Sequence, residues 1–327
     1  MEYTVAKDGS GDFTSLQEAI DAAAERPEAV TVRIRKGIYE ERVVAHKDNL
    51  RIVGEDVMET ILTGRGCAKD LHPDGTEKTT FLSATFMVTG RDVTVENLTI
   101  RNDAGDGRVV GQAVAVYAAG DRGIWRGCRF IAHQDTLYCG PLRIPDVVAE
   151  IAPRTGSAEQ HPRVQDGPLT TSRQYFADCY IEGDVDFIFG NYTCWFEGCT
   201  LFVNERGGWY TAANTHQEQP YGLIFHRCRL TGSCGEGRAY LGRPWREYAG
   251  TFFLECEMEA CVAPEGFTDW DETRKLQEGR CGEWATTGAR ADLRTRHPME
   301  KRLTREEAAA LTPDRVLRGN DAWRPAP

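Results

Sequence analysis

The chain has 327 residues, of which 41% are hydrophobic, and a formal net charge of −11 at pH 7. The hydrophobic share excludes a wholly disordered chain, and the acidic balance argues against nucleic acid as the main partner, because phosphate binding needs a basic face. Since no run of 18 apolar residues occurs, we expect no membrane span.

The two ends of the chain carry the helical signals. A strand-like run starts at Met1, and the segment from Ser15 to Ala24 has helical composition, as does the segment from Thr304 to Leu311. Neither the basic segment nor the apolar core of a signal peptide is visible. The sequence as given therefore predicts a cytoplasmic protein, or a secreted one if a leader has been removed.

A short pattern recurs through the middle of the chain, where β-branched and aromatic runs dominate. It consists of an aromatic residue, two further residues, a cysteine, one residue and a large residue. Leu98 takes the cysteine position in one copy, with Val95 at the aromatic position, and the other copies centre on Cys128, Cys179, Cys199, Cys228 and Cys256. A free cysteine behaves as a small buried hydrophobe. We therefore interpret the copies as equivalent strands stacked along one core, not as metal or disulfide sites.

The spacing of the copies predicts the fold. They lie 30, 51, 20, 29 and 28 residues apart, and repeats of this length indicate an all-β solenoid. We expect a single domain over 1–327, a right-handed parallel β-helix with short terminal helices; a β-sandwich, which also uses short strands, is the alternative. The long step contains residues 140–172, rich in Pro, Gly and polar residues, which we expect to form a surface insertion near the functional cleft.

Two acidic motifs lie at the same phase of this repeat. Asp135 follows Cys128 by seven residues, and Asp186 follows Cys179 by seven residues. On consecutive coils the two carboxylates would emerge at one height, roughly 4.8 Å apart. Their titrations would couple, leaving one acid as a proton donor and the other as an anionic nucleophile. Taken singly, each aspartate has a simpler explanation, because an Asp in a turn commonly caps its own backbone.

The residues after Asp186 predict how it is held. If this segment is a strand, alternation points Phe187 and Phe189 inward and Asp186 outward. A carboxylate held among large apolar residues is partly desolvated, which helps a weak nucleophile.

Further polar residues are candidates for the same site. Gln112 and Gln134 could donate to a developing oxyanion, although exposed glutamines or ladders between coils explain them too. Arg243 could bind a carboxylate through two hydrogen bonds, and Trp245 could stack on a sugar; a surface ion pair and a tryptophan at the core edge are the alternatives. The sequence holds no HExxH motif, no Cys/His cluster at zinc spacing and no GxSxG elbow. Any hydrolysis would therefore use carboxylates.

Taken together and in order, these motifs resemble those of the pectinesterase (pectin methylesterase) family. The resemblance covers nearly the whole chain and is carried by segments 5–14, 37–41, 83–86, 112–116, 134–138, 186–190, 241–245 and 317–325. It departs at 266–270, where Phe267 replaces the first of two tryptophans usual in the family. The resemblance implies a parallel β-helix that hydrolyses the C6 methyl esters of galacturonate, releasing methanol, without a metal or an organic cofactor.

The resemblance also implies roles by position. Asp186 is the expected nucleophile, and Asp135 is the expected acid and later base. Gln134, assisted by Gln112, is the expected oxyanion donor, and Arg243 is expected to orient Asp186 and keep it ionised. The expected substrate-binding residues are Trp245, Thr80, Tyr138 and Phe187.

Other functions stay open for the same pattern. Paired carboxylates also serve glycosidases, and the scaffold could host a hydrolase of other esters or thioesters. A non-catalytic carbohydrate-binding β-helix is a further alternative, although the joint presence of the two acids, Gln134 and Arg243 argues against it. The expected partner is methyl-esterified pectin or its oligogalacturonides, with no nucleic acid and no membrane.

Overall fold

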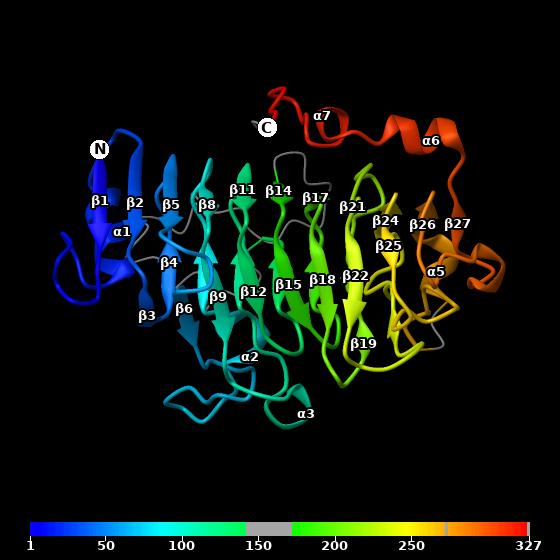
Figure 1. Cartoon of the computed structure of the whole chain (residues 1–327), viewed down its shortest axis with the longest axis horizontal. Coiled ribbons are helices and arrows are strands. Elements are labelled where there is room, and N and C mark those ends of the chain that lie inside the picture. The colour runs from blue at the N-terminus through cyan, green and yellow to red at the C-terminus, as the bar shows by residue number, and fades with distance from the viewer. Residues whose placement is uncertain (142–171, 272–273, 326–327) are drawn as a thin grey trace.

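The computed structural model describes residues 1–141, 172–271 and 274–325, and the strands in these ranges stack coil upon coil into three long parallel sheets (Figure 1). Sheet A contains, in order, β1 (Glu2–Val5), β2 (Val30–Ile34), β5 (Leu50–Gly54), β8 (Thr94–Glu96), β11 (Gly123–Arg126), β14 (Arg173–Ala177), β17 (Thr193–Glu197), β21 (Leu223–His226), β24 (Gly250–Leu254), β26 (Arg280–Trp284) and β27 (Lys301–Arg302). Sheet B contains β3 (Gly37–Glu40), β6 (Thr60–Gly64), β9 (Thr99–Asn102), β12 (Arg129–Ile131), β15 (Tyr180–Gly183), β18 (Thr200–Val203), β22 (Arg229–Gly232) and β25 (Glu257–Met258). Sheet C contains β4 (Val43–Ala45), β7 (Phe86–Val88), β10 (Val116–Ala118), β13 (Leu137–Cys139), β16 (Ile188–Gly190) and β20 (Thr211–Ala213), and β19 (Gly208–Trp209) pairs separately with β23 (Ala239–Tyr240).

The repeat in the sequence marks the corner between sheets A and B. Its aromatic residue lies in sheet A, and its cysteine directly precedes a strand of sheet B. The residue just before the cysteine position has a left-handed backbone in every copy: Asn97, Gly127, Asp178, Gly198, Arg227 and Glu255. The predicted parallel β-helix is confirmed, and each copy of the pattern spans a turn instead of lying along one strand.

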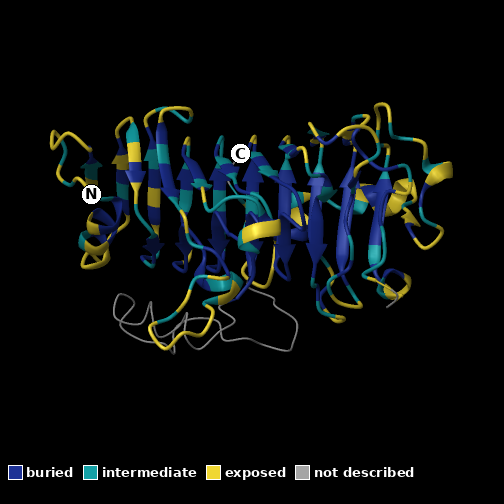
Figure 2. Cartoon of the chain, turned by 90° about the horizontal axis from the view of Figure 1, so that it is seen from below, coloured by how far each residue is buried: buried dark blue, intermediate teal, exposed yellow. Residues whose placement is uncertain are grey.

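Most residues of the strands are buried (Figure 2), and like side chains stack in a column inside the coils. The rings of Phe176, Phe196, Phe225 and Phe253 stack with successive centroid distances of 4.5, 4.4 and 4.7 Å. All eleven cysteines are buried free thiols, and the repeat thiols bond to backbone carbonyls, as Cys199 Sγ does to the oxygen of Glu197 at 3.5 Å. The expectation that these cysteines pack as small hydrophobes is confirmed.

The two longest helices of the described ranges lie near the two ends of the chain. Helix α1 (Leu16–Ala24) begins at Ser15, whose hydroxyl accepts from the Glu18 amide, and helix α6 (Arg305–Ala310) begins at the capping box of Thr304. Both helices match the sequence prediction. The short helices α2 (Thr79–Leu82), α3 (Gly107–Val110), α5 (Lys275–Glu278) and α7 (Pro313–Val316) and the 3-10 turn η2 (Leu293–Thr295) were not predicted, because a single turn carries no hydrophobic period.

The C-terminal arm, residues 303–325, turns back over the outside of sheet A (Figure 1). Ala308, Val316 and Leu317 of the arm pack in one hydrophobic cluster with Trp195 and Ile224 of the sheet. This packing covers a face of sheet A that would otherwise expose apolar side chains.

Two further expectations from the sequence concern the insertion at 140–172 and membrane spans. Of the insertion expected at 140–172, only residues 140, 141 and 172 are described, so that prediction lies outside the described residues. Among the helices in the described ranges, none has the length and apolar character that a membrane crossing requires.

Candidate active site

The two predicted acids occupy equivalent turns on neighbouring coils. Strand β13 pairs with β16 so that Leu137 lies opposite Ile188, and each acid lies two residues before its strand. Asp135 and Asp186 both have a left-handed backbone, with φ of 67° and 53°, which Asp adopts more readily than most residues. The expectation that the two carboxylates share one height and one face is confirmed.

A pocket of about 250 Å³ lies on the outer side of sheet C, where these two turns meet. Seven of the nine predicted site residues line it: Thr80, Gln112, Gln134, Asp135, Asp186, Arg243 and Trp245. Phe81, Phe189, Ala212 and Trp270 complete the lining. Asp135 and Asp186 are only 8% and 6% exposed, so both carboxyl groups face a small, weakly solvated space.

Arg243 holds Asp186 in a two-point ion pair. Its Nε donates to Oδ1 at 2.9 Å and its Nη2 donates to Oδ2 at 2.7 Å. The guanidinium carbon lies 3.9 Å from the ring centre of Trp209 and 4.1 Å from that of Trp270, and the Trp209 indole donates to Thr268. Paired charge and aromatic contacts on the same guanidinium fix its position, and therefore the position of the Asp186 carboxylate.

The electrostatics of the pocket distinguish its two acids. Burial raises the pKa of Asp135 well above its usual range, and the charge of Asp186 raises it further. Burial also raises the pKa of Asp186, but the hydrogen bonds and positive charge of Arg243 oppose that rise. Asp186 therefore loses its proton more readily than Asp135 does.

A second layer of polar residues lies behind the acids. Asp184 is fully buried, and it contacts Nδ1 of His133 at 3.3 Å, Nδ2 of Asn204 at 3.3 Å and Nη1 of Arg206 at 3.4 Å. The charge of Asp184 raises the pKa of Asp135 and of Asp186. The sequence analysis missed this layer, because its members come from three separate coils and carry no shared motif.

The two glutamines present free amide groups at the pocket. Gln112 and Gln134 are half-buried, and neither side chain has a hydrogen-bond partner among the residues that the structure describes. Gly107 makes room for Gln134, since a Cβ there would lie 2.8 Å from the Cβ of Gln134. Both amides are thus available to donate to a bound oxygen.

Two of the predicted substrate contacts need correction. Tyr138 is fully buried, and its ring packs at 5.0 Å from Phe81 and 4.8 Å from Phe189, so it supports the pocket wall from behind. Phe187 is also fully buried, in the main core, at 5.4 Å from the ring of Tyr210. Neither ring lines the pocket, so neither residue can touch a molecule bound there.

The expected alternation after Asp186 was also wrong in part. Phe187 and Ile188 both point into the main core, whereas Phe189 points outward and lines the pocket. The strand begins only at Ile188, because the left-handed turn at Asp186 interrupts the extended backbone. Period-two alternation therefore holds only from Ile188 onward.

Tryptophan residues beyond Trp245 were not assigned from the sequence. Trp209 contacts Arg243 from the short strand β19, and Trp270 lies in the segment where the family's tryptophan pattern was noted to depart. Within the described part of the chain, no group of three or more His, Cys, Asp or Glu residues is arranged to hold a metal ion.

Comparison with known proteins identifies this architecture. The pectinesterase family model matches residues 2–144 and 164–320. The chain belongs to the pectinesterase family. The break in the family match falls inside the segment predicted as an insertion.

Individual pectinesterases match over most of the chain. "Probable pectinesterase/pectinesterase inhibitor 13" of Arabidopsis thaliana is 32% identical, over 97% of this chain and 48% of its own length. "Pectinesterase 31" of the same plant is 30% identical, over 93% of this chain and 88% of its own length. The chain spans about half the length of the first curated relatives that it matches.

Solved pectin methylesterases share the fold. The enzyme from carrot superposes with a TM-score of 0.79 at 29% identity, covering 98% of this chain and 93% of its own. A pectin methylesterase in complex with hexasaccharide VII gives a TM-score of 0.78 at 26% identity, covering 99% and 98% of the two chains.

Proposed function

We propose that the chain is a pectin methylesterase, which hydrolyses the C6 methyl esters of galacturonate units to carboxylate and methanol. The observation that supports this most is the arrangement of Asp135 and Asp186, one coil apart in one pocket, with Arg243 bound to Asp186 alone. This gives one acid an anionic form and leaves the other its proton.

The first half of the proposed reaction forms a covalent intermediate. An oxygen of Asp186 attacks the ester carbonyl carbon, and the amides of Gln134 and Gln112 donate to the oxyanion that develops. When this tetrahedral species collapses, the bond to the methoxy oxygen breaks and Asp135 gives its proton to that oxygen. Methanol leaves, and the galacturonyl group stays on Asp186 as an anhydride.

The second half reaction restores the enzyme. Asp135, now a carboxylate, takes a proton from water as the water oxygen attacks the galacturonyl carbon. The bond to Asp186 breaks, which releases the galacturonic acid group and leaves Asp186 ionised beside Arg243. The released acid then loses its proton to the solvent. Both acids then carry the charges with which the cycle began.

Substrate binding follows from the charge of the pocket and its aromatic rim. Because the chain is strongly acidic and two carboxyl groups line the pocket, we propose that it takes esterified units in preference to charged ones. Trp245, half-buried at the rim, offers a flat apolar face to a sugar ring, and Thr80 lies across the same pocket. The relative solved with hexasaccharide VII supports an oligosaccharide as the ligand.

Methanol release from methylated oligogalacturonides of defined length tests the proposal. We expect one methanol per ester hydrolysed and no new reducing ends. New reducing ends would instead indicate a glycosidase, whose paired carboxyl groups can lie at a similar separation, about 5 Å in retaining enzymes. Turnover of acetyl esters or thioesters with no methanol release would favour the other hydrolase alternative.

A further inference from the structure

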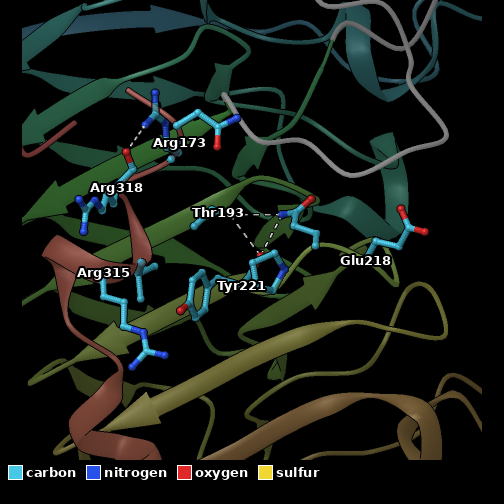
Figure 3. A pocket seen from close by; sticks show the side chains of 11 residues that line it. Arg173, Thr193, Glu218, Tyr221, Arg315 and Arg318 are labelled. Carbon is cyan, nitrogen blue, oxygen red and sulfur yellow. Dashed lines mark hydrogen bonds between the residues drawn. The ribbon is translucent and has the colours of Figure 1, made fainter. Parts of the chain in front are cut away.

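A second pocket, of about 490 Å³, lies where the C-terminal arm crosses sheet A (Figure 3). Its floor comes from Arg173 and Thr193, the first residues of β14 and β17, and from the loop 218–221 before β21. Its other wall is the arm segment 315–320. The volume is within the range of about 300–1,000 Å³ typical of pockets that hold small ligands.

The arginines of this pocket differ in how they are engaged. Arg173 is buried and bound to the carboxylates of Asp121 and Asp321, so its charge is already neutralised. Arg315 and Arg318 are exposed, and neither guanidinium forms an ion pair with another residue in the described ranges. Two cationic groups therefore remain available in a chain whose net charge is −11.

The opposite side of the pocket is preformed and partly apolar. Gln219 is 1% exposed, and its amide donates to the oxygens of Asn191 at 2.7 Å and Tyr221 at 2.9 Å, which fixes the loop. The half-buried ring of Tyr221 borders the space, and Figure 3 places Glu218 on the far side of it from Arg315. An aromatic face beside free guanidinium groups suits a sugar that carries a carboxylate.

The proposed active site lacks this combination. Its Arg243 is committed to Asp186 and lies between two tryptophans, and its other charged groups are acids. The described lining of the proposed active site therefore offers no unpaired cation to a galacturonate carboxylate. The second pocket has unpaired guanidinium groups in its described lining. It lies on the same coil as the active site, because β16, which carries Phe189, is followed directly by β17, which begins at Thr193.

We propose that the pocket between the C-terminal arm and sheet A is a second carbohydrate site, which binds de-esterified galacturonate through Arg315 and Arg318. The choice of sugar rests on the proposed esterase function. The site would hold the product form of the chain, whereas the active site takes the esterified form.

Calorimetric titration with de-esterified trigalacturonate tests this proposal. The double variant Arg315→Gln/Arg318→Gln should bind at least tenfold more weakly than the unchanged protein. The matched control is Arg305→Gln, an exposed arginine of the same arm outside the pocket, which should bind normally. Circular dichroism and the unfolding midpoint check that each variant is folded, and Arg315→Gln alone provides a milder change.

Further titrations separate the ligand chemistry and the two proposals. Fully methylated trigalacturonate and inorganic phosphate should both bind at least tenfold more weakly than trigalacturonate. Equal binding by the double variant, or by phosphate, would overturn the assignment of a uronate site. The same titration on the Asp186→Ala variant measures binding without turnover. If trigalacturonate binds this variant but the unchanged protein shows no esterase activity, only the proposed function is refuted.

Discussion

At the scale of single residues, the site depends on two aspartates of like sequence context and unlike surroundings. Both emerge from left-handed turns, and both are buried, but only Asp186 has a guanidinium bound to it. The spacing of the motifs was enough to predict that the two acids lie close together, because residues at the same position in successive coils of a solenoid are neighbours. Trp209, which contacts Arg243 from another coil, and the buried contacts of Asp184 with His133 and Asn204 could not be predicted, since no local motif links these residues.

Replacement of Gln134 by Ala should lower kcat by about 10²–10³-fold, because it removes one amide donor to the oxyanion. KM should change little, since this hydrogen bond strengthens only as negative charge develops. Steady-state kinetics on a methylated oligogalacturonide measure both constants. A rise in KM with unchanged kcat would show that Gln134 binds the ground state and the transition state equally, which would contradict the oxyanion role.

The pH profile of kcat/KM should rise as Asp186 loses its proton and fall as Asp135 loses its own. Because Arg243 opposes the burial-driven rise in the pKa of Asp186, Arg243→Gln should raise that pKa and move the acidic limb to higher pH. The control is Arg227→Gln, which removes an exposed arginine paired with Glu255 outside the pocket. An unshifted acidic limb in the Arg243 variant would contradict the electrostatic role given to this residue.

At the scale of elements, the corner between sheets A and B explains both the success and the limit of the sequence prediction. Asn97, Gly127, Asp178 and Gly198 are residue types that favour a left-handed turn, but Arg227 and Glu255 adopt the same conformation. The repeat was visible because five coils place an aromatic ring and a thiol at the same two positions of the core. The turn at Asp186 was not, and so Phe189, which was expected to point inward, was placed on the wrong side.

Removal of one ring from the aromatic column should destabilise the coils on either side. Phe196 is fully buried and stacks on both Phe176 and Phe225, so Phe196→Ala should lower the free energy of unfolding by about 3–5 kcal/mol. Urea unfolding followed by circular dichroism measures the loss. Phe202→Ala, at a partly exposed position of β18, is the control and should cost clearly less; equal losses would contradict the importance of the column.

At the scale of the whole molecule, charged side chains are buried at two places in the C-terminal part of the fold, under the arm and near the last coil. Arg173 ties the arm to sheet A through Asp321 and the carbonyls of Leu317 and Arg318. Near the last coil, Arg296 is paired with Glu283, whereas the oxygens of Glu300 have no hydrogen-bond partner among the described residues. These long-range pairs follow from no local pattern, so the sequence alone did not predict them.

Stability should fall with rising pH because of Glu300. Burial and the nearby Glu283 raise the pKa of Glu300 to about 10, from an ordinary value of 4.5. The folded chain therefore keeps a proton that the unfolded chain loses, and this contribution to stability declines as pH rises from 4.5 toward 10. Urea midpoints measured from pH 5 to 9 should decline less steeply for Glu300→Gln than for the unchanged chain, and parallel profiles would refute the assignment.

The central claim is that Asp186 attacks the ester carbon while Asp135 supplies the proton. The most direct test is the rate of methanol release by Asp186→Asn, which keeps the shape of the side chain and removes its charge, on a methylated oligogalacturonide. We predict a loss in kcat on the order of 10⁴-fold or more, with the folded structure retained. A folded variant that releases methanol at a rate near that of the unchanged chain would contradict the account.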